Sequence, residues 1–125
     1  MIVGIGTDII EIDRIRSAMS KSEHSFLKRV FSEQEIKYYK MNHYNISSVA
    51  GGFAAKEAVM KALGTGLRGF KLIDIEILRD DLGKPFVVLH NHADRIAKEK
   101  AIQIIHLSIS HCQQYATAYA VAEKD

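Results

Sequence analysis

Apolar positions near the start of the chain change from a strand pattern to helical spacing. Residues 2–5 are rich in β-branched side chains, which favour a strand. From residue 9 onward, apolar positions recur at helical intervals, at Ile9, Ile12, Ile15 and Met19. The change of period predicts that Asp8 ends a strand at or near the start of a helix. Because Asp and Thr are good N-cap residues, capping by Asp8 or Thr7 is one interpretation of this position.

Two further helices are predicted before residue 64. Ser32-Glu33-Gln34-Glu35 has the form of a capping box, which predicts a short helix through Tyr39. A longer central helix follows and carries Glu57, and Ser47 or Ser48 is expected to cap it.

The second half of the chain has the alternation typical of strands. Residues 73–77 alternate isoleucine with acidic side chains, and the turn at 81–84 leads into an apolar run at 85–89, which predicts a hairpin. Residues 104–110 and 115–121 predict a second pair of strands.

A charged helix is predicted between the two hairpins, at residues 93–100, and we expect it to be exposed. Helices followed by hairpins indicate an α+β fold with an antiparallel sheet and packed helices. No linker, repeat or low-complexity tract divides the chain, so we expect one compact domain over residues 1–125.

Glu57 falls on the face of the central helix that is expected to pack. At about 100° per residue, its apolar neighbours around the helix axis are Ala50, Phe53, Ala54 and Met60. An ionised carboxylate among apolar side chains is costly unless a cation or hydrogen-bond donors satisfy it. A pair with Lys61, one turn later on a solvated edge, is the simpler interpretation of Glu57 taken alone.

Asp8 and Glu57 together favour a metal site over two unrelated structural roles. Mg²⁺ is typically held by one or two carboxylates, while water and phosphate oxygens complete its octahedron. A carboxylate at a strand end and another on a helix, with Lys61 close by and glycines after the helix, predict a site for Mg²⁺ and a phosphate-bearing ligand.

The run Gly64-Thr65-Gly66-Leu67-Arg68-Gly69 matches the dinucleotide-binding pattern G-x-G-x-x-G. That pattern binds pyrophosphate where it follows a strand and opens a helix, whereas a helix precedes it here, so we reject a Rossmann site. Gly64 is expected to cap the preceding helix. The backbone N–H groups of Gly64, Thr65 and Gly66 can still approach a phosphate.

Net charge places limits on the partners of the protein. The formal net charge of +2 is too small to indicate nucleic acid binding. Basic residues are denser in and just after the first predicted helix, at Arg14, Arg16, Lys21, Lys28 and Arg29. This cluster is either a dock for an acidic partner or an ordinary solvated helix face.

The single cysteine, Cys112, cannot form an internal disulfide, and its neighbours do not supply a zinc pattern. A reducing cytoplasm is the simplest location for such a chain. Asp8 and Glu11 interrupt the apolar N-terminal stretch, which argues against a signal peptide. No run reaches the roughly 18 apolar residues of a membrane span, so we expect a soluble cytoplasmic protein.

Three segments carry a family resemblance. They are Gly4-Ile5-Gly6-Thr7-Asp8-Ile9, then Phe53-Ala54-Ala55-Lys56-Glu57-Ala58 with Lys61-Ala62 and Gly64-Thr65-Gly66, and finally His106-Leu107-Ser108-Ile109-Ser110-His111. In this order and spacing they closely resemble the holo-acyl-carrier-protein synthase family, a short single-domain class of 4′-phosphopantetheinyl transferase. The resemblance covers nearly the whole chain and implies the fold of that family.

The resemblance implies transfer of 4′-phosphopantetheine from coenzyme A to a serine of apo acyl carrier protein, in support of fatty acid biosynthesis. Asp8 and Glu57 would hold Mg²⁺ against the diphosphate, and Lys61 would offset developing charge. Lys56 points about 100° away from Glu57, so it is expected only as a further phosphate contact. The serine proton could leave to a metal-bound water, to Glu57 or to another base.

His111 lies at the end of a predicted strand, where a turn residue would be the default interpretation. Its position matches the family histidine near the coenzyme A site, and the resemblance therefore implies a binding role. A general-base role is also open, because imidazole titrates near neutrality.

The resemblance also implies the partners of the protein. An acidic carrier protein favours the docking interpretation of the basic cluster, with Arg14, Lys28 and Arg29 as binding residues. The family is usually a homotrimer with active sites at subunit interfaces, and we expect the same assembly here.

The chain departs from the family at one position. Members often carry a basic residue just before Phe53, whereas this chain has Gly51-Gly52. The corresponding contact would be absent, or Arg68 or Lys71 would supply it.

Two other classes of function remain open from the sequence. A module that binds coenzyme A or an acidic protein without chemistry would not need Asp8 and Glu57 to converge on a metal. A different nucleotide-dependent enzyme could use the same Mg²⁺ pair and would release a different product.

Overall fold

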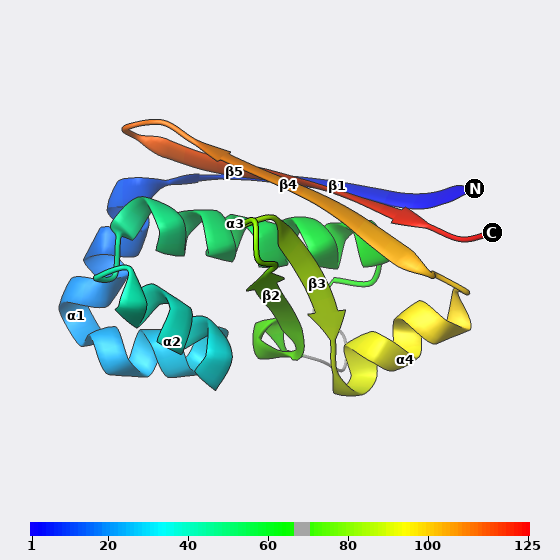
Figure 1. The fold of residues 1–125 in the computed structure, drawn as a ribbon, viewed down its shortest axis with the longest axis horizontal. Helices are drawn as coiled ribbons and strands as arrows, with labels where there is room; N and C mark the ends of the chain where they lie inside the picture. Colours follow the sequence, from blue (N-terminus) through cyan, green and yellow to red (C-terminus); the bar gives the residue numbers. More distant parts are fainter. Residues whose placement is uncertain (67–70) are drawn as a thin grey trace.

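The computed structural model describes residues 1–66 and 71–125, which form two antiparallel sheets and the helices packed against them (Figure 1). In chain order the elements are β1 (Ile2–Glu11), α1 (Ile12–Val30), α2 (Glu33–Met41), α3 (Ile46–Leu63), the 3₁₀-helix η1 (Leu72–Asp74), β2 (Ile75–Arg79), β3 (Pro85–Leu89), α4 (Asn91–Glu99), β4 (Ile104–His111) and β5 (Tyr115–Glu123). Among these residues, no helix combines the length and apolar character needed to cross a membrane. The predicted α+β class is confirmed.

The larger sheet has the strand order β1-β5-β4, and both strand pairs are antiparallel. It lies along one side of the molecule, and α3 packs lengthwise beneath β1 and β5 (Figure 1). The inner face of β5 consists of small buried residues, Ala116, Ala118, Ala120 and Ala122. Because these side chains are small, the helix can approach the sheet closely.

Glycine allows the same close approach on β1. A Cβ atom added at Gly4 would lie 2.0 Å from the carbonyl oxygen of Ala62 in α3. Real Cβ atoms do not come so near a backbone oxygen, so a side chain at this position would push the strand off the helix. The glycines of the N-terminal segment therefore fix the distance between β1 and α3.

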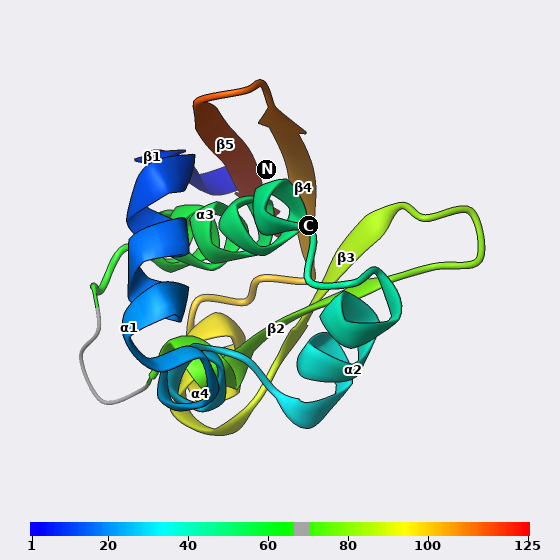
Figure 2. The same cartoon turned by 90° about the vertical axis from the view of Figure 1, so that its left-hand side faces the viewer.

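The predicted hairpin is confirmed as the second sheet, in which β2 pairs with β3 from Ile75↔Leu89 to Arg79↔Pro85. Gly83 in its turn has φ of 84°, a conformation that glycine adopts without strain. Figure 2 shows this hairpin projecting beside α2.

The predicted helix between the hairpins is present as α4, but it is not wholly exposed. Ala93, Ile96 and Ala97 are buried against the main core. Their spacing of three and four residues gives α4 an apolar stripe, while its charged residues face solvent.

Two apolar clusters hold the layers together. One lies between α3, the larger sheet, the hairpin and α4, and the other joins α1 and α2 to the first half of α3. Phe31 and Tyr39 make an edge-to-face contact in the second cluster, with ring centroids 5.1 Å apart. The α3 helix belongs to both clusters, so it is the central element of the fold.

The capping box before α2 is confirmed. The Glu35 N–H donates to Ser32 Oγ at 3.2 Å, and the Ser32 N–H donates to Glu35 Oε1 at 2.8 Å. The predicted cap of the central helix is wrong, because Asn45, rather than Ser47 or Ser48, precedes it. The Asn45 side chain accepts from the Ser48 N–H at 3.1 Å, which satisfies a free donor of the first turn.

The prediction that Asp8 ends a strand is also wrong. β1 continues three residues further, because β5 offers backbone partners from Asp8↔Ala118 to Glu11↔Tyr115. Asp8 is therefore not a helix cap, and Glu11 at the start of α1 makes no side-chain capping bond. Pairing with the distant strand β5 overrides the local change of apolar period.

Candidate metal and phosphate site

Asp8 and Glu57 meet at one cavity between β1 and α3. Asp8 lies in the middle of β1 with its side chain on the face that packs against α3, and Glu57 is half-buried on α3. Both line a cavity of about 380 Å³. The structure therefore brings together the two carboxylates that the sequence analysis paired.

The electrostatics of the cavity favour a cation. Burial raises the pKa of Glu57, the negative charge of Asp8 raises it further, and Lys61 partly lowers it. Two carboxylates that repel each other in a partly desolvated site are stabilised by a divalent ion between them. One or two carboxylates are the protein ligands that Mg²⁺ typically uses, so Asp8 and Glu57 could hold such an ion.

Lys61 forms its ion pair with Asp8 and not with Glu57, the partner in the simpler interpretation of that helix. Its Nζ donates to the Thr7 carbonyl oxygen at 2.9 Å and to Asp8 Oδ1 at 3.3 Å. The Lys61 side chain is 51% exposed, so its ammonium is not enclosed by the pair with Asp8. It thus lies between β1 and α3, beside both carboxylates.

The cavity is also lined by residues that the sequence analysis did not assign to the metal site: Ile9, Ile10, Glu11, Arg14, Phe53 and Tyr115. Tyr115 follows the last turn of the chain and reaches the site because β5 pairs with β1 at Glu11. No local pattern could reveal this contact, because it depends on the register of two distant strands.

Gly64 caps α3 as predicted. It adopts the left-handed conformation with φ of 80°, and its N–H donates to the carbonyl oxygens of Met60 and Lys61. Gly66 also has positive φ, 63°, so the segment after α3 needs glycine at both positions. Gly69, the third glycine of the pattern, lies outside the described residues, as does Arg68.

A cation that the sequence analysis missed lies beside this glycine segment. Lys100 Nζ donates to the Leu63 carbonyl oxygen at the C-terminal end of α3. It lies 3.2 Å from where a Cβ atom of Gly64 would be. The contact satisfies a helix C-terminal carbonyl, which is a favourable place for a cation.

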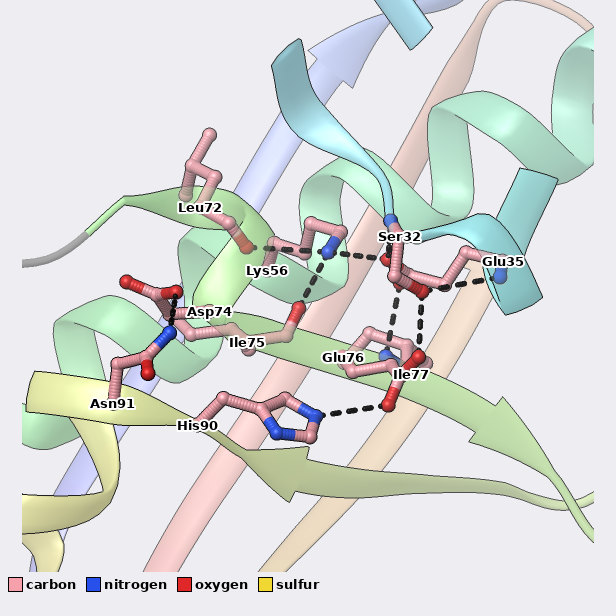
Figure 3. Close-up of polar contacts among 10 residues, drawn as sticks. All are labelled: Ser32, Glu35, Lys56, Leu72, Asp74, Ile75, Glu76, Ile77, His90 and Asn91. Atoms are coloured by element: carbon pink, nitrogen blue, oxygen red, sulfur yellow. Dashed lines mark hydrogen bonds and ion pairs between the residues drawn. The ribbon is translucent and has the colours of Figure 1, made fainter. Parts of the chain in front are cut away.

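Lys56 is the main correction to the predicted ligand contacts. Its side chain has no exposed surface, and it forms an ion pair with Glu35 at 2.7 Å (Figure 3). Neighbouring side chains of a helix point in different directions. The Lys56 side chain points away from the larger sheet, into the interior between α2, α3 and η1. A phosphate cannot reach the ammonium there, so Lys56 is removed from the predicted coenzyme A contacts.

His111 lies at the end of β4, exposed and paired with Ala116 of β5. It does not line the cavity that Asp8 and Glu57 share. Ala116 is next to Tyr115, which does line that cavity, and the binding role of His111 stays a prediction.

The basic cluster forms a depression on α1. Arg14, Lys21 and Arg29 line a hollow of about 350 Å³ together with Phe26. Arg14 also lines the Asp8 and Glu57 cavity, so the two hollows meet at this residue. Lys28 is exposed on the last turn of α1 but does not line the hollow.

The departure at Gly51-Gly52 has a structural explanation at its second residue. A Cβ atom at Gly52 would lie 1.8 Å from the hydroxyl oxygen of Tyr39. The Tyr39 ring is buried, so it has little room to move aside. In this arrangement of α2 and α3, position 52 does not accommodate a basic side chain.

Comparisons with known proteins agree with the resemblance found in the sequence. A model of the 4′-phosphopantetheinyl transferase superfamily matches residues 4–120. The chain is 51% identical to the holo-[acyl-carrier-protein] synthase of Clostridium perfringens, over 98% of this chain and 95% of that protein.

Solved structures show the same similarity. The holo-[acyl-carrier-protein] synthase of Neisseria meningitidis is 36% identical and superposes with a TM-score of 0.91, over 99% of this chain and 100% of that one. The enzyme of Bacillus anthracis, solved in complex with CoA (3′,5′-ADP), is 40% identical with a TM-score of 0.81, over 100% of this chain and 99% of that one.

Proposed function

The chain belongs to the 4′-phosphopantetheinyl transferase superfamily, and from this membership we propose that it is a Mg²⁺-dependent enzyme. Its reaction is that of a holo-[acyl-carrier-protein] synthase: the 4′-phosphopantetheine group moves from coenzyme A to a serine of apo acyl carrier protein. Adenosine 3′,5′-bisphosphate is the other product. One observation supports the metal: Asp8 and Glu57 line one cavity, and the charge of Asp8 raises the pKa of Glu57.

Asp8 and Glu57 would hold Mg²⁺ in this proposal. When bound, Mg²⁺ neutralises charge on the diphosphate and orients its oxygens for in-line attack. The two carboxylates come from a strand and a helix rather than from loops, so their separation is set by the packing of β1 on α3. This rigidity favours one geometry for the ligand.

Lys61 supplies a positive side-chain charge next to Asp8. Its ammonium donates to the Thr7 carbonyl oxygen and to Asp8, which holds the side chain beside the metal ligand. A cation in this place attracts the diphosphate of coenzyme A and offsets charge that develops on the leaving group. The N–H of Gly64 is used in capping α3, so the backbone N–H groups of Thr65 and Gly66 would bind further phosphate or pantetheine oxygens.

Calorimetric titration tests the metal proposal. Mg²⁺ added to the protein with coenzyme A present should give a binding isotherm, and Asp8→Ala and Glu57→Ala should each abolish it. Glu99→Ala removes an exposed carboxylate at the end of α4 and should bind as the parent does. Equal binding by all four proteins would contradict the assignment of the ligands.

The carrier protein would dock on α1. Arg14, Lys21 and Arg29 present positive charge around a hollow, and Arg14 also reaches the metal cavity. An acidic helix of the carrier protein bound there would place its serine close to Asp8 and Glu57. Lys28, exposed nearby, would add charge at the rim of the contact.

We also propose that the protein is a homotrimer whose larger sheet faces the other subunits. The outer face of this sheet carries large exposed apolar residues, among them Ile5 (71% exposed), Ile9 (67%) and Tyr119 (59%). None of the helices and strands within residues 1–66 and 71–125 covers this face in Figure 1. Such a patch is typical of a protein interface. Active sites would then lie between subunits, where His111 of one copy could approach the coenzyme A bound to another.

We further propose that the acyl carrier protein is that of fatty acid biosynthesis and that the protein works in the cytoplasm. The single cysteine, Cys112, is exposed and has no partner within the chain for a disulfide, which suits a reducing compartment. Fractionation of cells followed by immunodetection tests this location.

A further inference from the structure

Lys56 is buried on the side of α3 that faces away from the larger sheet, and all three N–H donors of its ammonium have acceptors there. Its Nζ donates to Glu35 Oε1 at 2.7 Å, to the Leu72 carbonyl oxygen at 3.2 Å and to the Ile75 carbonyl oxygen at 2.5 Å. An ammonium group has three donors, so none remains for a ligand.

Both carboxylate oxygens of Glu35 also have hydrogen-bond donors. Its Oε1 atom accepts from the Ser32 N–H at 2.8 Å, and Oε2 accepts from the Ile77 N–H at 2.9 Å. The pair therefore joins α2, α3, η1 and β2 at one point, as Figure 3 shows. Neither side chain has any exposed surface.

Stability alone does not explain this pair. Removing two charges from water is costly, and well-packed apolar residues of similar volume often stabilise a protein as much or more. What an ion pair with additional hydrogen bonds provides is direction, because each bond requires a particular distance and angle. Such accuracy is needed where a functional side chain depends on the orientation of a helix.

The face of α3 that meets the larger sheet sets the distance to β1 but constrains the rotation of the helix less. Where it meets the sheet, α3 presents the small side chains of Ala54, Ala58 and Ala62. Small, smooth surfaces resist rotation and sliding weakly, because few side chains interlock across them. Lys56 instead inserts a long side chain between neighbouring elements, and it directly precedes Glu57.

We propose that Lys56 is a positioning residue, which fixes the rotation of α3 about its axis so that Glu57 faces Asp8. Its bond to the Leu72 carbonyl also fixes the chain that returns after the Gly64-Gly66 segment. This inference rests on the proposed metal site. It assigns to Lys56 a role in the reaction that requires no contact with substrate.

Binding of Mn²⁺ tests the inference, because Mn²⁺ replaces Mg²⁺ at oxygen sites and its free concentration is measured by electron paramagnetic resonance. The parent and Lys56→Met are titrated with Mn²⁺ in the presence of coenzyme A, and kcat and the KM for the carrier protein are measured on the same samples. Lys37→Met, an exposed lysine on α2, is the matched control.

We expect Lys56→Met to weaken Mn²⁺ binding and to lower kcat by about 10- to 100-fold, the usual effect of losing a group that orients a metal ligand. The KM for the carrier protein should change less than kcat, because Lys56 makes no hydrogen bond to α1, and Lys37→Met should match the parent. A merely structural residue would lower the melting temperature without separating kcat from KM in this way. A folded Lys56→Met protein with Mn²⁺ binding and kcat within about twofold of the parent would overturn the inference.

Lys56→Met leaves Glu35 buried without its cation and can fail to fold for that reason. The double variant Glu35→Met with Lys56→Met removes both charges and avoids this problem. If it folds, it should show the same loss of Mn²⁺ affinity and kcat, and parent-like values would overturn the inference. If neither variant folds, the pair is a requirement of folding and the positioning role is also overturned. Failure of the parent itself to bind Mn²⁺ would instead contradict the proposed metal site.

Discussion

Gly6 of β1 lies directly against the Ala58 carbonyl oxygen of α3, on the helix turn that carries Glu57. A Cβ atom at Gly6 would come within 1.9 Å of that oxygen. The oxygen belongs to the helix backbone and cannot turn aside as a side chain would. The contact therefore sets the distance between the two elements that carry the candidate metal ligands.

Gly6→Ala should therefore destabilise the protein by about 1–3 kcal/mol, as overpacking of a tight contact does. It should also reduce transfer, because β1 and Asp8 move away from Glu57. Urea denaturation and an activity assay measure the two effects. Lys37→Ala, at an exposed position of α2, is the control and should change neither. Gly6→Ala with parent stability would show that β1 does not sit where the structure places it.

The raised pKa of Glu57 predicts a dependence of stability on pH. Burial and the charge of Asp8 raise this pKa above 4.5, so the ionised side chain destabilises the folded metal-free protein. A carboxyl whose pKa is higher in the folded state costs stability above that pKa, and the cost disappears below the unfolded value. Without metal, Glu57→Gln should therefore be more stable than the parent at pH 7.

The difference in unfolding free energy between Glu57→Gln and the parent should shrink as the pH falls towards 4.5. Urea titrations at a series of pH values, in the presence of EDTA, measure it. Adding Mg²⁺ at pH 7 should reverse the order, because only the parent keeps both carboxylates. A variant that is less stable than the metal-free parent at pH 7 would contradict the repulsion between Asp8 and Glu57.

Charge reversal on α1 tests the dock for the carrier protein. Arg14→Glu and Arg29→Glu should each raise the KM for apo acyl carrier protein about tenfold, because they place negative charge against an acidic surface. Arg29 lies outside the Asp8 and Glu57 cavity, so Arg29→Glu should change coenzyme A affinity little. Arg16→Glu is the matched control, because Arg16 is on the same helix, pairs with Asp13 and does not line the hollow. Unchanged KM in the two variants would remove the docking proposal.

The proposed trimer depends on the outer face of the larger sheet. Tyr119→Glu should dissociate it, because a carboxylate would be buried between apolar surfaces. Light scattering after size-exclusion chromatography should give three times the 14.0 kDa chain mass for the parent and one chain mass for the variant. Leu82→Glu is a stringent control, since Leu82 is 95% exposed in the hairpin turn and lies outside this face. A monomeric parent would contradict the proposal.

Local patterns were sufficient for much of the fold. The Ser32 capping box, the hairpin and the last two strands are specified by residues close together in sequence, and all are present. The extent of β1 was not predictable in this way, because the residues from Asp8 to Glu11 are held in the strand by β5, more than a hundred positions away.

The candidate site, like the fold, was predictable from the sequence only in part. Asp8, Glu57 and Lys61 lie together as the sequence analysis expected, because strand and helix periodicity put all three on facing surfaces. The role of Lys56 could not be seen, since nothing in the neighbouring residues indicates a buried partner. Glu35 precedes it by 21 positions and meets it only because α2 folds against α3.

The intact mass of apo acyl carrier protein, after incubation with this protein and coenzyme A, tests the central claim most directly. We expect a gain of one phosphopantetheine group when Mg²⁺ is present, no gain with EDTA, and no gain with Asp8→Ala or Glu57→Ala. An unmodified carrier protein in the presence of Mg²⁺ would contradict the transferase activity. A full gain despite EDTA would show that transfer does not need a metal held by Asp8 and Glu57.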